Sequence, residues 1–192
     1  MPQTVYVVRH GETAWTITGQ HTGRTDIPLT SQGEEDARQL GKWLPSQRPL
    51  CVLTSPLARA RQTCELAGFG ADAQPDADLM EWDYGAYEGR RSAEIRERRP
   101  HWQLFDDGCP GGETAEMVGA RADRVIAKVR AYAGDAVLFA HRDLLRVLAV
   151  RWIALAARQG RHFDLSPASI GILGYDILNS PLIRVWNDLP RP

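Results

Sequence analysis

The stretch TVYVVRHGET, residues 4–13, joins a short apolar run to a polar turn. Its β-branched first half predicts a strand that is buried on both faces. Residues 51–54, CVLT, and residues 136–140, AVLFA, have the same apolar character. Each of these runs leads directly into a polar side chain, Ser55 in one case and His141 in the other. We therefore expect three buried strands that each end in a chemically useful group.

Amphipathic and apolar segments follow these strands and predict helices that pack on the sheet. Ser31 and Glu34 form a capping-box pattern at the start of one helix, and Pro56 suits the first turn of another. The expected helices cover residues 31–44, 55–67, 92–98, 113–132 and 144–155. The expected last strands cover residues 169–175 and 183–186. Strands that alternate with helices predict a three-layer α/β/α sandwich with a mostly parallel central sheet.

The composition predicts one globular domain, residues 1–192, with a core of ordinary size. Hydrophobic residues make up 43% of the chain and charged residues 24%, and the net charge of -1 gives no overall attraction to nucleic acid or to an anionic membrane. Three cysteines without a C-x-x-C pair favour neither a disulfide framework nor a cysteine zinc site. There is no apolar run long enough to span a bilayer and no signal-peptide pattern, so we expect a cytoplasmic protein.

Polar groups at the ends of parallel strands meet at one edge of the sheet, where open α/β sheets bind their ligands. Here that edge would collect Arg9, His10, Ser55 and His141. Arg59 follows in the first turns of a helix whose free N–H groups and dipole also favour an anion. Two imidazoles and two guanidinium groups predict a pocket for a phosphoryl group, because the planar fork of arginine binds two phosphate oxygens at once.

A neutral imidazole nitrogen is a nucleophile when the other ring nitrogen holds the proton. The leaving oxygen then needs a proton from a separate acid. Glu81 is the candidate, because it lies in a polar, irregular stretch, residues 79–112, that is long enough to form a lid over the sheet edge. Trp82 and Tyr84 beside it would help to keep its pKa raised. No H-x-x-x-H or H-E-x-x-H spacing occurs, so we expect neither a metal site nor a cofactor.

Residues 9–13, RHGET, resemble the R-H-G-[EQ]-T signature of the histidine phosphatase superfamily, whose members look like phosphoglycerate mutases. Three further segments, residues 22–30, 54–63 and 81–89, resemble other motifs of that family in the same order. The resemblance implies a phosphoglycerate mutase-like fold in which His10 is the nucleophile and Glu81 the proton donor. It implies that the phosphate is bound by Arg9, Arg59 and His141. It implies that the rest of the substrate is held by Thr22, Gly23 and Tyr84.

Residues 107–114, DGCPGGET, and residues 19–23, GQHTG, are similar to segments of the sedoheptulose-1,7-bisphosphatase-type subgroup. That subgroup has A-H-G-H-x-L-R after the last core strand, whereas this chain has Arg142 and Asp143 in place of Gly and His. Arg142 either crowds the pocket or adds a substrate contact, and we include it among the substrate-binding candidates. Asp143 brings a negative charge that would cancel Arg142 if the two side chains pair.

These residues favour a metal-independent phosphatase that hydrolyses a small phosphorylated metabolite, a sugar phosphate or bisphosphate, through a phosphohistidine intermediate. Two alternatives stay open: a cofactor-dependent phosphomutase of the phosphoglycerate mutase type, and a phosphate-binding or regulatory protein whose turnover is low because of Arg142 and Asp143. The expected partner is a small phosphoester, with no nucleic acid and no membrane. Trp152, Ile153 and Leu155 form an apolar group that is either core or the face of a homodimer.

Overall fold

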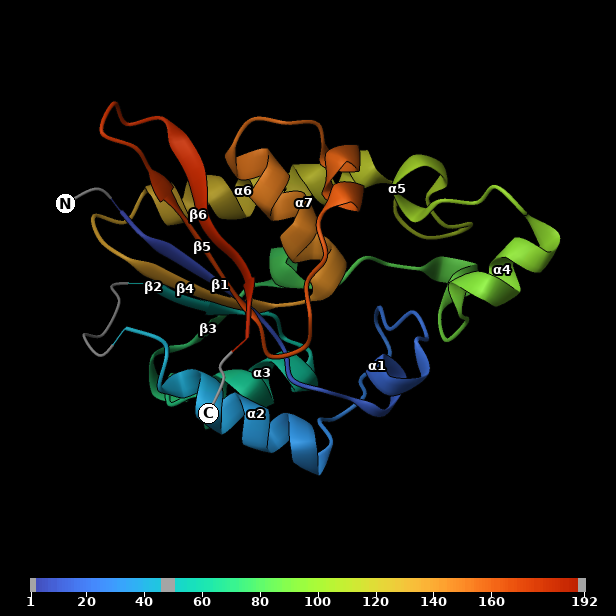
Figure 1. Cartoon of the computed structure of the whole chain (residues 1–192), viewed down its shortest axis with the longest axis horizontal. Helices are drawn as coiled ribbons and strands as arrows, with labels where there is room; N and C mark the ends of the chain where they lie inside the picture. Colours follow the sequence, from blue (N-terminus) through green and yellow to red (C-terminus); the bar gives the residue numbers. More distant parts are fainter. Residues whose placement is uncertain (1–2, 46–50, 190–192) are drawn as a thin grey trace.

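In the computed structural model, which describes residues 3–45 and 51–189, six strands form one sheet in the order β3-β2-β4-β1-β5-β6 (Figure 1). The strands are β1 Val5–Arg9, β2 Cys51–Thr54, β3 Gln74–Pro75, β4 Ala136–Ala140, β5 Ile170–Tyr175 and β6 Pro181–Asp188. The pairs β1–β4, β4–β2 and β2–β3 are parallel, whereas β5 is antiparallel to β1 and β6 to β5. The expected mostly parallel sheet is therefore confirmed, and the expected domain, residues 1–192, extends at both ends beyond the described residues.

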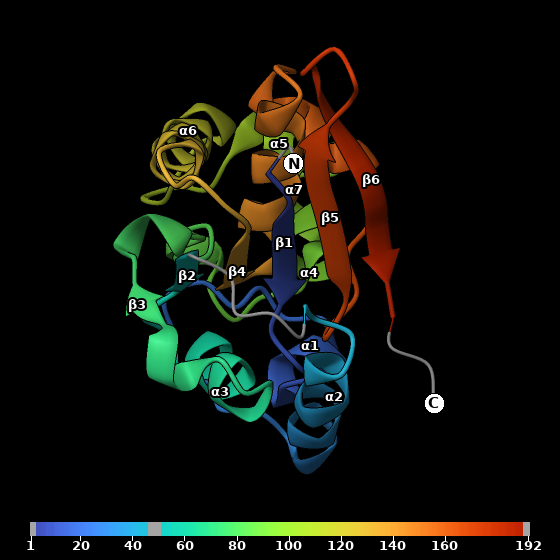
Figure 2. The same ribbon diagram turned by 90° about the vertical axis from the view of Figure 1, so that its left-hand side faces the viewer.

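The described part of the chain has helices on both faces of this sheet, with α6 and α7 on one face and α2 and α3 on the other (Figure 2). The α-helices are α1 Ala14–Thr18, α2 Ser31–Gly41, α3 Ala58–Leu66, α4 Ser92–Arg98, α5 Leu104–Asp107, α6 Ala115–Arg130 and α7 Arg142–Trp152. The 3-10 helices are η1 Gly70–Asp72, η2 Ala77–Leu79, η3 Gly85–Tyr87 and η4 Ala157–His162. The three-layer α/β/α architecture is thus confirmed.

Two hydrophobic cores lie on the two faces of the sheet, because successive strand residues point to opposite sides. On β1, Val7 packs into the core that contains α6 and α7, and Val8 packs into the core that contains α2 and α3. On β4, Leu138 and Phe139 divide in the same way. Burial on both faces explains why these strands are continuous apolar runs instead of alternating patterns.

The bounds of β2, β4 and α4 agree with the sequence prediction, and α2 begins at Ser31 as expected, but its N-cap differs from the predicted one. The capping box of Ser31 and Glu34 is wrong, because Thr30 is the N-cap and its side chain accepts a hydrogen bond from the Gly33 N–H. Thr30 is held there by Glu12, whose carbonyl accepts from the Thr30 N–H at 2.9 Å and whose carboxylate accepts from the Thr30 hydroxyl at 2.7 Å. Tertiary contacts thus place the N-cap of α2 one residue before the predicted one.

The other differences also lie where local sequence signals are weak. Helix α3 begins at Ala58, with Leu57 at the N-cap, so Pro56 precedes the helix instead of occupying its first turn. Helix α7 begins at Arg142, two residues before its expected start. The sequence analysis predicted neither α1, five residues long with none buried, nor the two-residue strand β3. In the apolar group at the end of α7, which the sequence left open as core or homodimer face, Trp152 is buried, whereas Leu155 is 44% exposed.

Residues 79–112 lie beyond the carboxyl ends of the central strands, with α4 farthest from the sheet (Figure 1). Buried tryptophans tie this segment down. The Trp82 indole N–H donates to the Glu113 carbonyl at 3.0 Å, and the Trp102 indole N–H donates to the Gly108 carbonyl at 2.9 Å. The segment is therefore packed as an ordered unit that begins beside the end of the sheet.

Among the described helices, none combines the length and the apolar character needed to cross a membrane.

The turn after β1 presses closely on the first turn of α2. A Cβ atom on Gly11 would lie 2.4 Å from the Gly33 carbonyl oxygen, and a Cβ atom on Gly33 would lie 2.3 Å from the Glu12 carbonyl oxygen. Both distances are too short for any side chain, and the contacting atoms are backbone. The close approach of these two segments therefore requires glycine at both positions.

We expect Gly33→Ala to lower the free energy of unfolding by about 1–3 kcal/mol, because the added methyl group forces the two backbones apart. Urea denaturation monitored by tryptophan fluorescence measures this change. Gln32→Ala, at an exposed position of the same helical turn, is the control and should change stability by less than about 0.5 kcal/mol. Equal stabilities of the two variants would contradict the close-contact argument.

Candidate active site

Two histidines face each other where β1 and β4 end. In the parallel β1–β4 pair Arg9 is opposite Ala140, so the next residue on each strand, His10 and His141, leaves the sheet at the same level. The backbone N–H of His10 donates to the Ala140 carbonyl at 3.0 Å, which continues the strand pairing by one residue. The two ring centroids lie 5.2 Å apart with the ring planes inclined by 59°. The expected convergence of the strand ends is therefore what the structure shows.

The His10 ring has a defined tautomer. Its Nδ1 lies 2.7 Å from the Gly11 carbonyl oxygen, so Nδ1 carries the proton and donates it, and Nε2 keeps a free lone pair. The Gly11 peptide is itself held, because its N–H donates to the Thr63 hydroxyl at 3.0 Å. Burial, and then the charges of Arg59 and Arg9, hold the pKa of His10 well below its usual value. His10 is therefore a neutral imidazole with an available nitrogen at neutral pH.

The second imidazole has the opposite tautomer. His141 Nδ1 accepts a hydrogen bond from Arg59 Nε at 3.1 Å, so the proton is on Nε2, which donates to the Ser55 hydroxyl at 2.7 Å. Burial, followed by the charges of Arg59 and His10, lowers the pKa of His141 well below its usual value. A neutral His141 thus presents an N–H group on the side of Ser55.

Arg59 is a fully buried guanidinium that ties a loop to this centre. Its Nη1 donates to the Thr25 carbonyl at 3.0 Å, and its Nη2 donates to the carbonyls of Thr22 at 3.0 Å and Gly23 at 2.9 Å. Together with the bond to His141, these contacts use four of its five N–H groups. Burial lowers the pKa of Arg59, although Glu81 and Tyr84 oppose this effect.

Arg9 has an N–H group without a partner. Its Nη1 donates to the Leu165 carbonyl at 2.5 Å, but its Nε is the one buried side-chain nitrogen or oxygen in residues 3–45 and 51–189 that lacks a hydrogen bond. Burial, and then the nearby positive charge of Arg142, lower the pKa of Arg9 to about 10. A buried, charged and incompletely satisfied guanidinium is suited to an anionic ligand, because such a group costs free energy until it is paired.

Glu81 binds the N-terminal end of α7. Its Oε1 accepts from the N–H groups of Trp82 at 2.8 Å and Leu144 at 3.0 Å, and its Oε2 accepts from the Asp143 N–H at 3.1 Å. Burial and then the Asp143 charge raise the pKa of Glu81, against the three N–H groups that favour its charged form. A carboxyl group with a raised pKa in this position can both give and take a proton.

Asp143 forms its ion pair with Arg146 and not with Arg142. Its Oδ1 accepts from Arg146 Nη1, and its Oδ2 accepts from the Tyr84 hydroxyl, both at 2.6 Å. Although burial by itself would raise it, Arg146 and Arg142 lower the pKa of Asp143 to about 2. The Arg142 guanidinium instead donates to Asp164 at 2.9 Å. The expectation that Asp143 pairs with Arg142 and cancels it is therefore wrong, because Arg146, one helical turn further on, reaches the carboxylate first.

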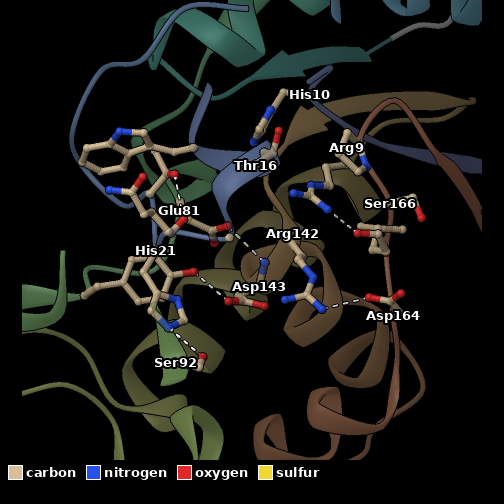
Figure 3. Close-up of a pocket in the computed structure, with 17 residues that line it drawn as sticks. Arg9, His10, Thr16, His21, Glu81, Ser92, Arg142, Asp143, Asp164 and Ser166 are labelled. Carbon is tan, nitrogen blue, oxygen red and sulfur yellow. Dashed lines mark hydrogen bonds and ion pairs between the residues drawn. The ribbon is translucent and has the colours of Figure 1, made fainter. Parts of the chain in front are cut away.

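A pocket of about 330 Å³ opens in front of His10 (Figure 3). Its wall contains six of the nine candidate residues: Arg9, His10, Thr22, Glu81, Tyr84 and Arg142. Arg59 and His141 do not line it and pack beside His10 instead. Gly23 is also outside the wall, since a Cβ atom there would lie 2.5 Å from the Glu88 carboxylate. Its backbone, held by Glu88 and Arg59, positions the loop.

The rest of the wall comes from residues that the sequence analysis did not select. They are Trp15, Thr16, Gly19, Gln20, His21, Ser92, Asp143, Asp164, Leu165, Ser166 and Pro167. Most of them lie on α1 and the loop after it, or on the loop before β5. Neither segment has a periodic pattern or a cluster of chemically active side chains. The signal in the sequence was the motif at residues 19–23, which contains Gly19, Gln20 and His21.

Comparisons with known proteins agree with this geometry. The sequence model described as histidine phosphatase superfamily (branch 1) matches residues 5–189. An acid phosphatase of Mycobacterium tuberculosis is 37% identical over 175 residues, which cover 88% of this chain and 85% of the relative. Sedoheptulose 1,7-bisphosphatase of Saccharomyces cerevisiae is 36% identical over 185 residues, which cover 80% of this chain and 68% of the relative. The solved structure of open reading frame Rv3214 from Mycobacterium tuberculosis superimposes with a TM-score of 0.93 at 34% identity. The superposition covers 98% of this chain and 99% of the other.

The two buried neutral imidazoles make stability depend on pH. The pKa of each histidine is lower in the folded protein than in the unfolded chain. At pH values between these two pKa values, the unfolded chain therefore binds more protons than the folded protein. The stabilisation is complete above about pH 6.5 and is lost as the pH falls below it. We expect His141→Gln, which keeps one donor and one acceptor, to reduce the loss of unfolding free energy between about pH 7.5 and about pH 5.5 by roughly 1 kcal/mol.

Chemical denaturation at the two pH values measures this difference. His101→Gln, at an exposed histidine, is the matched control and should leave the pH dependence of the parent protein unchanged. If both variants lose stability on acidification as steeply as the parent, protonation of buried His141 is not part of acid unfolding.

Proposed function

The chain belongs to the histidine phosphatase superfamily, and we propose that it hydrolyses a phosphate monoester of a small metabolite through a phosphohistidine at His10. It is a phosphoric monoester hydrolase, as its phosphatase relatives are. One observation carries the residue assignment: His10 Nε2 is free because the Gly11 carbonyl holds the proton of Nδ1. This nitrogen stands at a pocket whose wall also contains a partly unpaired guanidinium and a carboxyl group with a raised pKa.

The first half of the reaction transfers the phosphoryl group to the protein. His10 Nε2 attacks phosphorus, and the bond between phosphorus and the leaving oxygen breaks. Glu81, protonated, gives its proton to that oxygen, so the leaving group departs as an alcohol and not as an alkoxide. In the second half the Glu81 carboxylate takes a proton from a water molecule, whose oxygen attacks phosphorus. His10 is released, and the product is inorganic phosphate.

Positioned cations stabilise the charge on the transferring group. Arg9 is the best placed, because it lines the pocket and has a free Nε–H. Arg59 and His141 bind the same anion from the side of His10, and the protein contacts of Arg59 leave one of its five N–H groups available for it. These cations also disfavour protonation of His10, so they keep the nucleophile available.

The pocket is at the small end of the range for ligand sites, which suits a metabolite. Thr22 and Tyr84 line it, and their hydroxyl oxygens can accept hydrogen bonds from the hydroxyls of a sugar. Gly23 acts through its backbone only. Residues 79–112 supply Glu81, Tyr84 and Ser92, and this segment acts as the substrate-specificity insertion. Arg142 does not argue against turnover, because it takes a helical backbone conformation open to any residue and pairs with Asp164.

We expect His10→Ala to lower the rate of phosphate release at least about a thousandfold, because no other group replaces the attacking nitrogen. Phosphate release from p-nitrophenyl phosphate in EDTA measures the rate. Rapid quenching of the parent enzyme should trap an acid-labile, alkali-stable phosphoprotein that is missing from the variant. His162→Ala, at an exposed position outside the pocket, is the control.

Full activity of His10→Ala would overturn the mechanism, and loss of parent activity in EDTA would overturn its metal independence. The product identifies the reaction. Inorganic phosphate indicates a phosphatase, whereas an isomerised phosphoester that requires a bisphosphorylated primer indicates a phosphomutase.

Glu81→Gln tests the proton donor. Glutamine keeps the shape and, with its oxygen at the Oε1 position, the acceptor for the N–H groups of Trp82 and Leu144, but it cannot protonate the leaving oxygen. We expect hydrolysis of an alkyl phosphate to slow by about 10²–10⁴-fold, and hydrolysis of p-nitrophenyl phosphate, whose leaving group needs no proton, to slow far less. Glu116→Gln, at an exposed position on α6, serves as the comparison. Equal losses on both substrates would remove Glu81 from the role of acid.

A further inference from the structure

Arg142 places a second guanidinium in the pocket beyond Arg9. It is the first residue of α7, directly after His141, and its side chain runs along the wall toward Asp164. In the view of Figure 3 the Arg9 guanidinium lies between His10 and the Arg142 guanidinium. The positive charge of Arg142 lowers the pKa of Arg9, second only to burial, so the two cations are close enough to repel each other. Two neighbouring guanidinium groups in one pocket are stabilised when anions lie between or beside them.

The present partner of Arg142 holds it weakly. Asp164 is 71% exposed and the Arg142 side chain is 42% exposed, with 2.9 Å between Nη2 and Oδ1. Ion pairs of this exposure contribute about 0–1 kcal/mol, because water solvates both partners when they separate. Asp143 differs, since it is only 2% exposed and is bound at 2.6 Å by both Arg146 and Tyr84. A ligand can therefore take Arg142 from Asp164, but not Arg146 from Asp143.

The other acidic groups at the pocket are already satisfied. The Glu81 carboxyl group accepts three backbone N–H groups, and Asp143 has its two buried donors. Among the charged side chains that line this pocket, Arg9 and Arg142 are the cations, and neither is tied to a buried carboxylate in the described part of the chain. The wall thus contains two positions for anions, one beside His10 at Arg9 and one farther from it at Arg142.

We propose that Arg142 binds a second anionic group of the substrate, a carboxylate or a phosphate, which replaces Asp164 as its partner. This inference rests on the phosphatase function proposed above, in which Arg9 binds the transferred phosphoryl group. The substrate then carries two anionic groups joined by a short polar chain. Polar side chains elsewhere on the wall, among them His21, Ser92 and Ser166, are suited to the hydroxyls of that chain. The replacement of the usual glycine by Arg142 thus becomes a determinant of specificity.

Two pairs of substrates measure the effect of the second anion. The pair 3-phosphoglycerate and glycerol 3-phosphate differs in a carboxylate, and the pair fructose 1,6-bisphosphate and fructose 6-phosphate differs in a phosphate. For each pair the readout is the kcat/KM of the compound with two anionic groups divided by the kcat/KM of the compound with one. In Arg142→Gln, which keeps most of the side-chain length, we expect at least one ratio to fall about tenfold to a hundredfold, mainly through KM. The pair that responds identifies the anion.

Asp164→Asn tests the displacement step in the opposite direction. Asparagine no longer competes as an anion for Arg142, so the same ratio should rise by up to about fivefold. The matched control is Arg161→Gln, because Arg161 forms an exposed ion pair with Asp106 at 2.6 Å and lies outside the pocket wall. It should leave both ratios unchanged. Melting temperatures of all three variants show whether the fold is retained.

Unchanged ratios in Arg142→Gln overturn the inference. An equal loss of kcat/KM on both members of each pair also overturns it, because Arg142 would then bind the transferred phosphoryl group or only support the structure. Calorimetric binding of the same four compounds to the parent and to Arg142→Gln separates this inference from the proposed function. If nothing is hydrolysed but Arg142→Gln selectively weakens binding of the compounds with two anionic groups, the phosphatase proposal fails and the anion site stands. If neither turnover nor binding discriminates, the anion site fails.

Discussion

The parallel pairing of β1 with β4 is the constraint on which the site depends. Its register sets Arg9 opposite Ala140, and the backbone bond from the His10 N–H to the Ala140 carbonyl extends it to the two histidines. A slip of one residue would turn every side chain of β1 to the opposite face, exchanging the two cores and separating the imidazoles. Because both faces of β1 are buried, such a slip is strongly disfavoured, and the same packing that stabilises the sheet aligns the reactive groups.

The start of α7 is the second organising element. His141 is its N-cap residue but provides no side-chain cap, so the free N–H groups of Asp143 and Leu144 bind the Glu81 carboxyl group from a distant segment. One helix end therefore positions the second imidazole and the proposed acid together. It also carries Arg142 and Asp143, whose charges act on Arg9 and on Glu81. Substitutions at this end of the helix can consequently change specificity and acid–base behaviour without moving the sheet.

Much of the fold could be predicted because buried strands have a simple sequence signature. Cys51–Thr54, apart from its last residue, and Ala136–Ala140 are apolar because helices cover both faces of the sheet, and both strands were predicted with correct bounds. The predicted capping box of α2 was wrong because Glu12, 18 residues away in the sequence, binds Thr30 and makes it the N-cap. Helix α1 and strand β3 were missed because five and two residues are too few to show a period.

The sequence by itself determined which chemical groups stand at the strand ends, because apolar runs identify the strands and the next residues along the chain are Arg9, His10, Ser55 and His141. Only the tertiary structure decided which nitrogen of each imidazole carries the proton, that Asp143 binds Arg146, and that Arg142 turns to Asp164. The physical reason is that a proton's position and a charge's partner depend on donors and acceptors that the fold brings within about 3 Å. Arg59 and His141 are 82 residues apart along the chain, and Arg142 and Asp164 are 22 residues apart, so no local pattern records these pairings.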